Sequence, residues 1–149
     1  MKLIKKNYKK ILSLFPKQNG SPFFNAKGVA VGVFCGCFPF FGFQTLLGIF
    51  LAKAAKGNLF LAAIGTWISN PFTYIPLYFF NYKVGSLLLK KSPDIIFDKN
   101  LMVDEIWEKG SFFSSRLILG SALVGLLLAS ISGIIVFLLY KRKQKKRLF

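Results

Sequence analysis

The sequence contains no histidine, and only five of its 149 residues are acidic. Histidine is the commonest general base near neutral pH and a frequent metal ligand, so its absence argues against most catalytic and metal-dependent chemistry. All five acidic residues lie between positions 94 and 108, outside the long hydrophobic runs. The glycine-lysine pattern of a phosphate-binding loop is also absent. We therefore expect neither enzymatic activity nor a cofactor.

Cysteine is equally scarce, with Cys35 and Cys37 the only two in the sequence. Two thiols without further soft ligands make a poor metal site, so we interpret both as small packing residues and expect no bound metal. The lysines at the start of the chain precede only a short apolar stretch, which Pro16 interrupts. No cleavage site of small residues follows, so we expect no secretory signal peptide.

What the sequence does contain is hydrophobic and basic. Hydrophobic residues make up 54% of it, and the formal net charge is +16. The charge lies in blocks between three uncharged runs, at residues 28–52, 59–82 and 117–140. Each run exceeds the roughly 20 helical residues that cross a bilayer core of about 30 Å. A core helix of a soluble protein is the alternative for any one run, but three with basic flanks predict an all-α integral membrane protein.

We divide the chain into a basic segment, 1–27, a membrane domain, 28–140, and a basic tail, 141–149. The first segment carries apolar residues at helical spacing with lysines largely off that stripe, which favours a helix on the membrane surface over a solvated tail. Within the domain, residues 83–116 form an amphipathic segment. There Ser92-Pro93-Asp94 is typical of a helix start.

Two of the hydrophobic runs are interrupted near their centres. Phe38-Pro39-Phe40-Phe41-Gly42 breaks the first run into arms that each cover about half a bilayer. This pattern favours a re-entrant hairpin over a kinked full span. Ser69-Asn70-Pro71-Phe72 breaks the second run in a similar way. Broken hydrophobic segments in corresponding positions point to the binding site of a transporter.

Polar and helix-breaking residues around these interruptions form our candidate intramembrane site. Non-helical backbone inside a bilayer is tolerated only within protein or beside water. The side chains therefore either satisfy the broken backbone or line a polar pocket or path. The candidate residues are Pro39, Gly42, Gln44, Thr45, Thr66, Ser69, Asn70, Pro71 and Thr73.

Small residues recur every four positions in two of the runs, a spacing that lets another helix approach closely. We expect the two stripes to pack against each other within one chain, with a second copy as the alternative partner. The stripes are Gly28, Gly32 and Gly36 in the first run and Ser121, Gly125, Ala129 and Gly133 in the last.

The distribution of basic residues predicts the topology. Residues 1–27 and 141–149 are both rich in lysine and arginine, which places both termini in the cytoplasm. Three full crossings cannot put both termini on one side. We therefore expect the run 28–52 to turn back and the runs 59–82 and 117–140 to cross.

Three motifs in order carry a family resemblance: Phe38-Pro39-Phe40-Phe41-Gly42-Phe43-Gln44-Thr45, then Lys56-Gly57-Asn58, then Gly65-Thr66-Trp67-Ile68-Ser69-Asn70-Pro71-Phe72-Thr73. The sequence resembles the bacterial membrane family of domain of unknown function 2062 over roughly residues 20–145. The resemblance implies a protein of the bacterial inner membrane, and the hydrophobic runs predict that it is multi-pass. Some relatives carry the domain beside glycosyltransferase domains. It implies no activity and assigns no functional residues.

Two functions remain open from the sequence. The first is a small transport or permeation element that uses the paired breaks. The second is a non-catalytic scaffold or assembly partner of envelope or lipid-linked sugar enzymes, either as a homo-oligomer or with a membrane enzyme. Anionic lipid head groups are the expected partners of the basic segments. Because the charge flanks membrane segments, we expect no nucleic acid.

Overall fold

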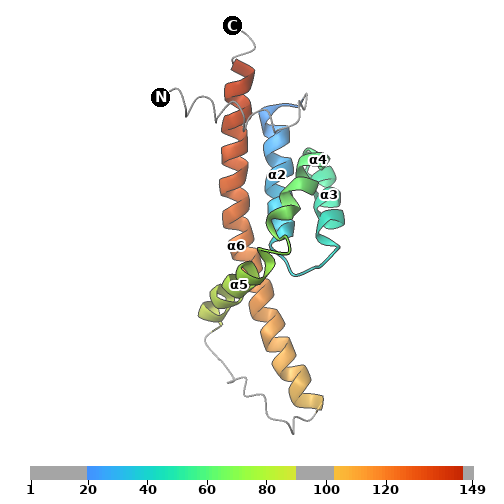
Figure 1. The fold of residues 1–149 in the computed structure, drawn as a ribbon, viewed down its shortest axis with the longest axis vertical. Helices are drawn as coiled ribbons and strands as arrows, with labels where there is room; N and C mark the ends of the chain where they lie inside the picture. The colour runs from blue at the N-terminus through green and yellow to red at the C-terminus, as the bar shows by residue number, and fades with distance from the viewer. Residues whose placement is uncertain (1–19, 90–102, 146–149) are drawn as a thin grey trace.

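The computed structural model describes residues 20–89 and 103–145, with side chains described from 110 onward in the second range. Both ranges are helical, which confirms the all-α fold class (Figure 1). The elements are α2 (Pro22–Gly36), α3 (Gln44–Ala54), α4 (Leu59–Gly65), the 3-10 helix η1 (Thr66–Ile68), α5 (Tyr74–Leu88) and α6 (Val103–Lys145).

The first hydrophobic run forms two helices and a connection between them. Helix α2 begins at a cap, where the Ser21 Oγ accepts a hydrogen bond from the Phe24 N–H at 3.1 Å and Pro22 occupies the first turn. The helix ends at Gly36, and α3 begins at Gln44. Figure 1 shows α3 running back beside α2, with which it packs. The break predicted at Pro39 is therefore present, and the chain reverses there.

The second run is also divided. The Asn58 side chain caps α4, which continues into η1 and stops at Ile68. Helix α5 starts at Tyr74 and runs past the predicted end of the run, as far as Leu88. The break predicted at Asn70-Pro71 is thus present as well.

Helix α6 is the longest element, with 43 residues. In the described part of the chain it provides the one helix long and apolar enough to cross a membrane, over Gly110–Lys145. The start of the segment 83–116 belongs to α5 and its last residues belong to α6. The helix start expected at Ser92 lies outside the described residues, as does most of the basic segment 1–27.

A small core joins α2, α4 and α6. Ala26, Leu61, Val136 and Tyr140 are buried there, with Val29 and Phe137 packed against them. Outside this core, large apolar side chains cover the surface. Phe72 is 91% exposed and Leu87 79%. In water, exposed apolar side chains of this extent would promote aggregation.

The two stripes of small residues do not pack against each other as expected. A Cβ atom on Gly28, Gly32 or Gly36 would run into backbone atoms of Asn58, Ala62 or Thr66, so the first stripe faces α4 and η1. The α6 stripe instead lies on another side of α2, with Gly125 beside Phe34 and Cys37 and Gly133 beside Ala30. Residues 28 and 30 are about 200° apart around a helix. Helix α2 therefore packs closely on two nearly opposite sides, against α4 on one and α6 on the other.

Helices α5 and α6 cross in close backbone contact that the sequence did not predict. A Cβ added at Gly85 would overlap the Arg116 carbonyl, and one added at Gly120 would overlap the Asn81 carbonyl. Ser121, which the sequence assigned to helix packing, is buried at the same crossing and accepts a hydrogen bond from Asn81 Nδ2 at 3.0 Å.

Candidate site at the two helix breaks

The first break follows from two residues. Pro39 has no backbone N–H and cannot continue the hydrogen-bond ladder of α2. Gly42 has φ of +81°, a conformation that L-residues with side chains rarely adopt, and it lies in open space. The N–H groups of Phe43 and Gln44 then both bond to the Phe40 carbonyl, at 3.0 and 3.1 Å, which starts α3.

The second break is a turn held by its own side chains. The Asn70 Oδ1 accepts hydrogen bonds from the N–H groups of Phe72 and Thr73, at 2.9 and 3.1 Å. In return the Thr73 Oγ1 accepts from the Asn70 N–H at 2.9 Å and donates to the Ile68 carbonyl at 2.6 Å. Asn70 and Thr73 therefore satisfy the broken backbone, one of the two roles the sequence left open.

Gln44 joins the two breaks. Its Nε2 donates to the Phe38 carbonyl in the first break and to the Tyr78 hydroxyl on α5, the latter at 2.7 Å. Its Oε1 accepts from the Ser69 hydroxyl in the second break at 2.7 Å. The Tyr78 hydroxyl in turn donates to the Phe38 carbonyl at 3.1 Å. We call Gln44, Ser69, Tyr78 and the Phe38 carbonyl the Gln44 node.

A second polar contact lies beside this node. The hydroxyls of Thr45 and Thr66 are 3.0 Å apart, which links α3 to η1. Because the Thr66 hydroxyl donates to the Ala63 carbonyl at 2.7 Å, the proton between the two threonines comes from Thr45.

Aromatic rings strengthen the contact between the first break and α5. The Phe41 ring meets Tyr74 edge to face at 5.7 Å between centroids, and it meets Tyr78 in the same way at 5.5 Å. Such pairs contribute about 0.5–1.5 kcal/mol beyond the area that they bury. The first break is therefore docked on α5 by both hydrogen bonds and rings.

A family model described as an uncharacterized protein conserved in bacteria, domain of unknown function 2062, matches residues 2–148. The chain belongs to this family. No curated protein and no solved structure matches it. Membership of the domain of unknown function 2062 family confirms the family resemblance noted in the sequence. The family description names neither a membrane location nor an activity.

The structure brings only some of the candidate residues together in this family member. Gln44 and Ser69 meet in the node, and Thr45 and Thr66 meet beside it. Five candidates shape the breaks without entering either cluster, namely Pro39, Gly42, Asn70, Pro71 and Thr73. Of these, Gly42 and Pro71 are exposed. The clusters contain no ionised group, and within the described ranges no three histidine, cysteine or acidic side chains gather around a common point. Their chemistry is therefore that of neutral hydrogen bonding.

Sequence reasoning missed several polar residues of this domain of unknown function 2062 protein. Tyr78 belongs to the node. A tyrosine within a hydrophobic run usually has a partner for its hydroxyl, and this signal was available in the sequence. Asn58 Nδ2 donates to the Asn25 Oδ1 at 2.7 Å where α2 meets α4. Asn81 Nδ2 donates to the Cys37 carbonyl at 2.9 Å, and Asn81 is fully buried.

The most unusual missed residue is Arg116. It lies at the start of the third hydrophobic run, yet it is only 2% exposed, and its guanidinium donates to the Tyr82 hydroxyl at 3.4 Å. Its position next to the uncharged run could have drawn notice, because a buried basic residue is costly unless it is paired or hydrogen-bonded.

Proposed function

We propose that this chain is a multi-pass membrane protein with a small permeation or carrier site where its two helix breaks meet. The large exposed apolar side chains, such as Phe72 and Leu87, support lipid as the surrounding solvent. Helix α6 is long enough to cross the bilayer. With 15 and 11 residues, α2 and α3 rise only about 22 and 16 Å, so this hairpin enters a core of about 30 Å and returns.

The charges support one orientation. The end of the fold that holds the α3–α4 connection carries Lys27, Lys53 and Lys56, and the last turns of α6 add four more basic residues at the same end (Figure 1). Residues 20–89 and 110–145 contain no acidic residue to offset them. In our proposal this end lies in the cytoplasm with both termini, while α5 and α6 reach the opposite side.

Cysteine accessibility tests this topology. With Cys35 and Cys37 replaced by alanine, single cysteines at Ser111 and Lys145 are labelled in spheroplasts by a membrane-impermeant thiol reagent. We expect labelling of position 111 from outside and of position 145 only after the membrane is opened. A cysteine at Lys53 should behave like position 145. Labelling of position 145 in intact spheroplasts would show the orientation to be wrong.

The permeation site itself is supported by the Gln44 node. Non-helical backbone lies at the meeting point of the two breaks, a position that membrane proteins reserve for protein-lined or water-lined regions. Each neutral hydrogen bond of the node contributes only about 0.5–1.5 kcal/mol, so the node can exchange its partners for those of a solute. Because the node holds no charge, an ionised solute would lose its hydration without compensation. The proposed solute class is therefore small, polar and neutral.

Flux into liposomes tests this function. We expect vesicles with the purified protein to take up glycerol or urea faster than protein-free vesicles, measured by light scattering after an osmotic step. Gln44→Leu keeps the side-chain size but removes the hydrogen bonds to Ser69 and Tyr78. It should change the rate of solute uptake by about tenfold or more. Ser130→Ala is the matched control, since its exposed hydroxyl bonds only to the Leu126 carbonyl of its own helix.

The flux measurement also distinguishes permeation from the second candidate function. A groove of about 450 Å³ lies between α2 and α6, with Ala30, Ala129 and Gly133 among its small residues and Phe23 and Phe137 among its aromatic ones. Small residues between large ones suit a partner helix, as in a scaffold or assembly partner of envelope enzymes. If wild-type protein with the expected topology moves neither solute, the permeation proposal is wrong and the scaffold is the better account.

A further inference from the structure

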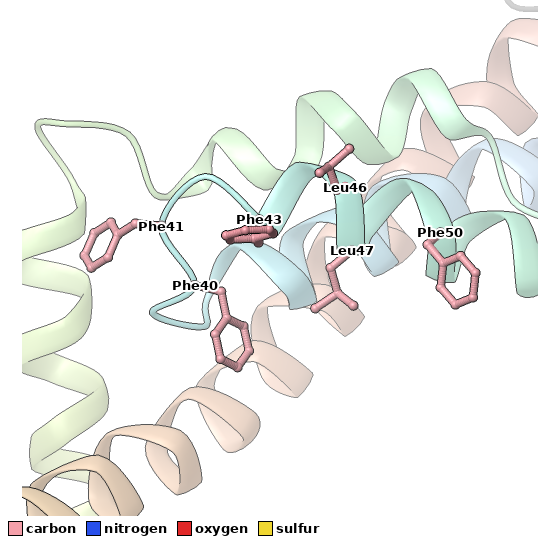
Figure 2. Close-up of a pocket in the computed structure, with 6 residues that line it drawn as sticks. All are labelled: Phe40, Phe41, Phe43, Leu46, Leu47 and Phe50. Carbon is pink, nitrogen blue, oxygen red and sulfur yellow. The ribbon is translucent and has the colours of Figure 1, made fainter.

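A lane of exposed apolar side chains runs along one side of α3. Phe43, Leu46 and Phe50 lie three and four residues apart and so share one face, and they are 71, 64 and 69% exposed. With Phe40, Phe41 and Leu47 they line a hollow of about 570 Å³ (Figure 2). We call Phe43, Leu46 and Phe50 the α3 lane.

The lane leads to a group of positive charges. Lys53 lies three residues after Phe50, at the spacing of the α3 lane, and Lys56 is the second residue after the end of the helix. Lys27 reaches the same place from α2, where its Nζ donates to the Ala55 carbonyl at 2.6 Å. Lys53 and Lys56 are exposed, and residues 20–89 contain no carboxylate to neutralise them.

Lys56 occupies a backbone position that usually belongs to glycine. The end of α3 is a Schellman motif, in which the Gly57 N–H bonds to the Ala52 carbonyl at 2.7 Å and the Lys56 N–H to the Lys53 carbonyl at 3.1 Å. Lys56 has φ of 52° there, the left-handed conformation that is unfavourable for residues with a Cβ. A strained residue of this kind is a reason to look for function.

The dimensions of the lane match one leaflet of a bilayer. From Phe43 to Lys53 a helix rises about 15 Å, which is half of a hydrocarbon core of about 30 Å. An apolar surface of that length, with uncompensated lysines at its end, complements a molecule with an acyl chain and an anionic head.

We propose that the α3 lane is a binding site for one anionic phospholipid, whose phosphate lies at Lys53 and Lys56 and whose acyl chain lies along Phe43, Leu46 and Phe50. The site rests on the proposed membrane location of the chain but not on the proposed permeation function. The strained Lys56 places a second charge beside Lys53, where glycine would be the relaxed choice. A free phosphate has nothing to place on the lane, so the occupant is a lipid.

Lipid titration of the full chain in a mild detergent, read by native mass spectrometry, tests the site. We expect wild type to prefer phosphatidylglycerol over phosphatidylcholine by at least about tenfold, the scale of two surface charges. Lys53→Gln/Lys56→Gln should remove this preference. Lys141→Gln/Lys143→Gln, which takes the same charge from the end of α6, should retain it. Equal losses in the two variants would show diffuse attraction and overturn the site.

Two further variants separate the site from folding and from phosphate binding. Lys56→Gly relieves the backbone strain, so it should weaken phosphatidylglycerol binding while the melting temperature stays the same or rises. Phe50→Ser should weaken binding of the lipid through its chain, and millimolar inorganic phosphate should not displace the lipid. Displacement by phosphate, or full binding by Phe50→Ser, would show that the lane holds no acyl chain.

Discussion

Gly120→Ala is expected to disrupt the crossing of α5 and α6 and to cause the largest loss of stability among single methyl additions to α6. The new Cβ would overlap the Asn81 carbonyl oxygen, a backbone atom that cannot rotate away. The helices must separate, which weakens the contacts of Asn81 with Cys37 and Ser121 as well. Overpacking of this kind costs about 3 kcal/mol, and we expect the melting temperature in detergent to fall by about 10 °C.

Gly110→Ala provides a control on the same helix. A Cβ at Gly110 meets nothing within 4 Å, and alanine is the better helix former there. We therefore expect an unchanged or slightly higher melting temperature, measured by light scattering or by loss of the monodisperse peak in size-exclusion chromatography. If the two alanine variants melt together, helices α5 and α6 do not cross at Gly120.

Asn58→Ala is expected to be the second most damaging change. The Asn58 Oδ1 accepts hydrogen bonds from the N–H groups of Phe60 and Leu61 at 3.1 and 3.2 Å, and so caps α4. Its Nδ2 donates to Asn25, which is fully buried. Loss of a cap costs about 1 kcal/mol, and a buried acceptor left without its donor costs about 1–3 kcal/mol. The sum is about 2–4 kcal/mol, to be measured by thermal or denaturant unfolding in detergent.

Asn58→Ser separates the two contributions. Serine is as good a cap as asparagine, but it is too short to replace the hydrogen bond to the Asn25 Oδ1. Its loss of stability should therefore lie between those of wild type and Asn58→Ala. A serine variant as unstable as the alanine variant would show that the cap contributes nothing, and a stable alanine variant would contradict the role of the buried pair.

The breaks were predictable because their causes are local. Pro39 lacks a donor wherever it stands, and Gly42 tolerates a positive φ that its neighbours do not. Asn70 and Pro71 end a helix by the same kind of short-range chemistry. The position of each break needs no knowledge of the rest of the fold.

The partners of each face were not predictable in the same way. The sequence shows that Gly28 and Gly32 form a stripe, but Ala26 and Ala30 make another side of α2 almost as small. Which side meets α4 and which meets α6 depends on contacts between residues far apart in sequence. For the same reason the sequence identified Gln44 as a candidate but not its partner Tyr78, 34 residues away.

The length of α6 was underestimated for a different reason. The sequence pattern divides the amphipathic segment 83–116 from the uncharged run 117–140, yet the charged and polar residues before Leu117 continue the same helical backbone. Hydrophobicity reports where a helix lies in lipid, whereas propensity and capping decide how far it extends. Arg116 falls at this boundary, as the last residue of the amphipathic segment 83–116.

Under the membrane topology that we propose, the order of the helices along the chain has a consequence for biogenesis. Helices α2, α3, α4 and α5 have 15, 11, 7 and 15 residues, all below the roughly 20 that a translocon recognises as a spanning segment. They leave the ribosome before α6, the helix that has the required length and hydropathy. We expect these segments to stay at the membrane interface during synthesis and to settle into the bilayer as a group once α6 provides the surface against which α2 and α5 pack.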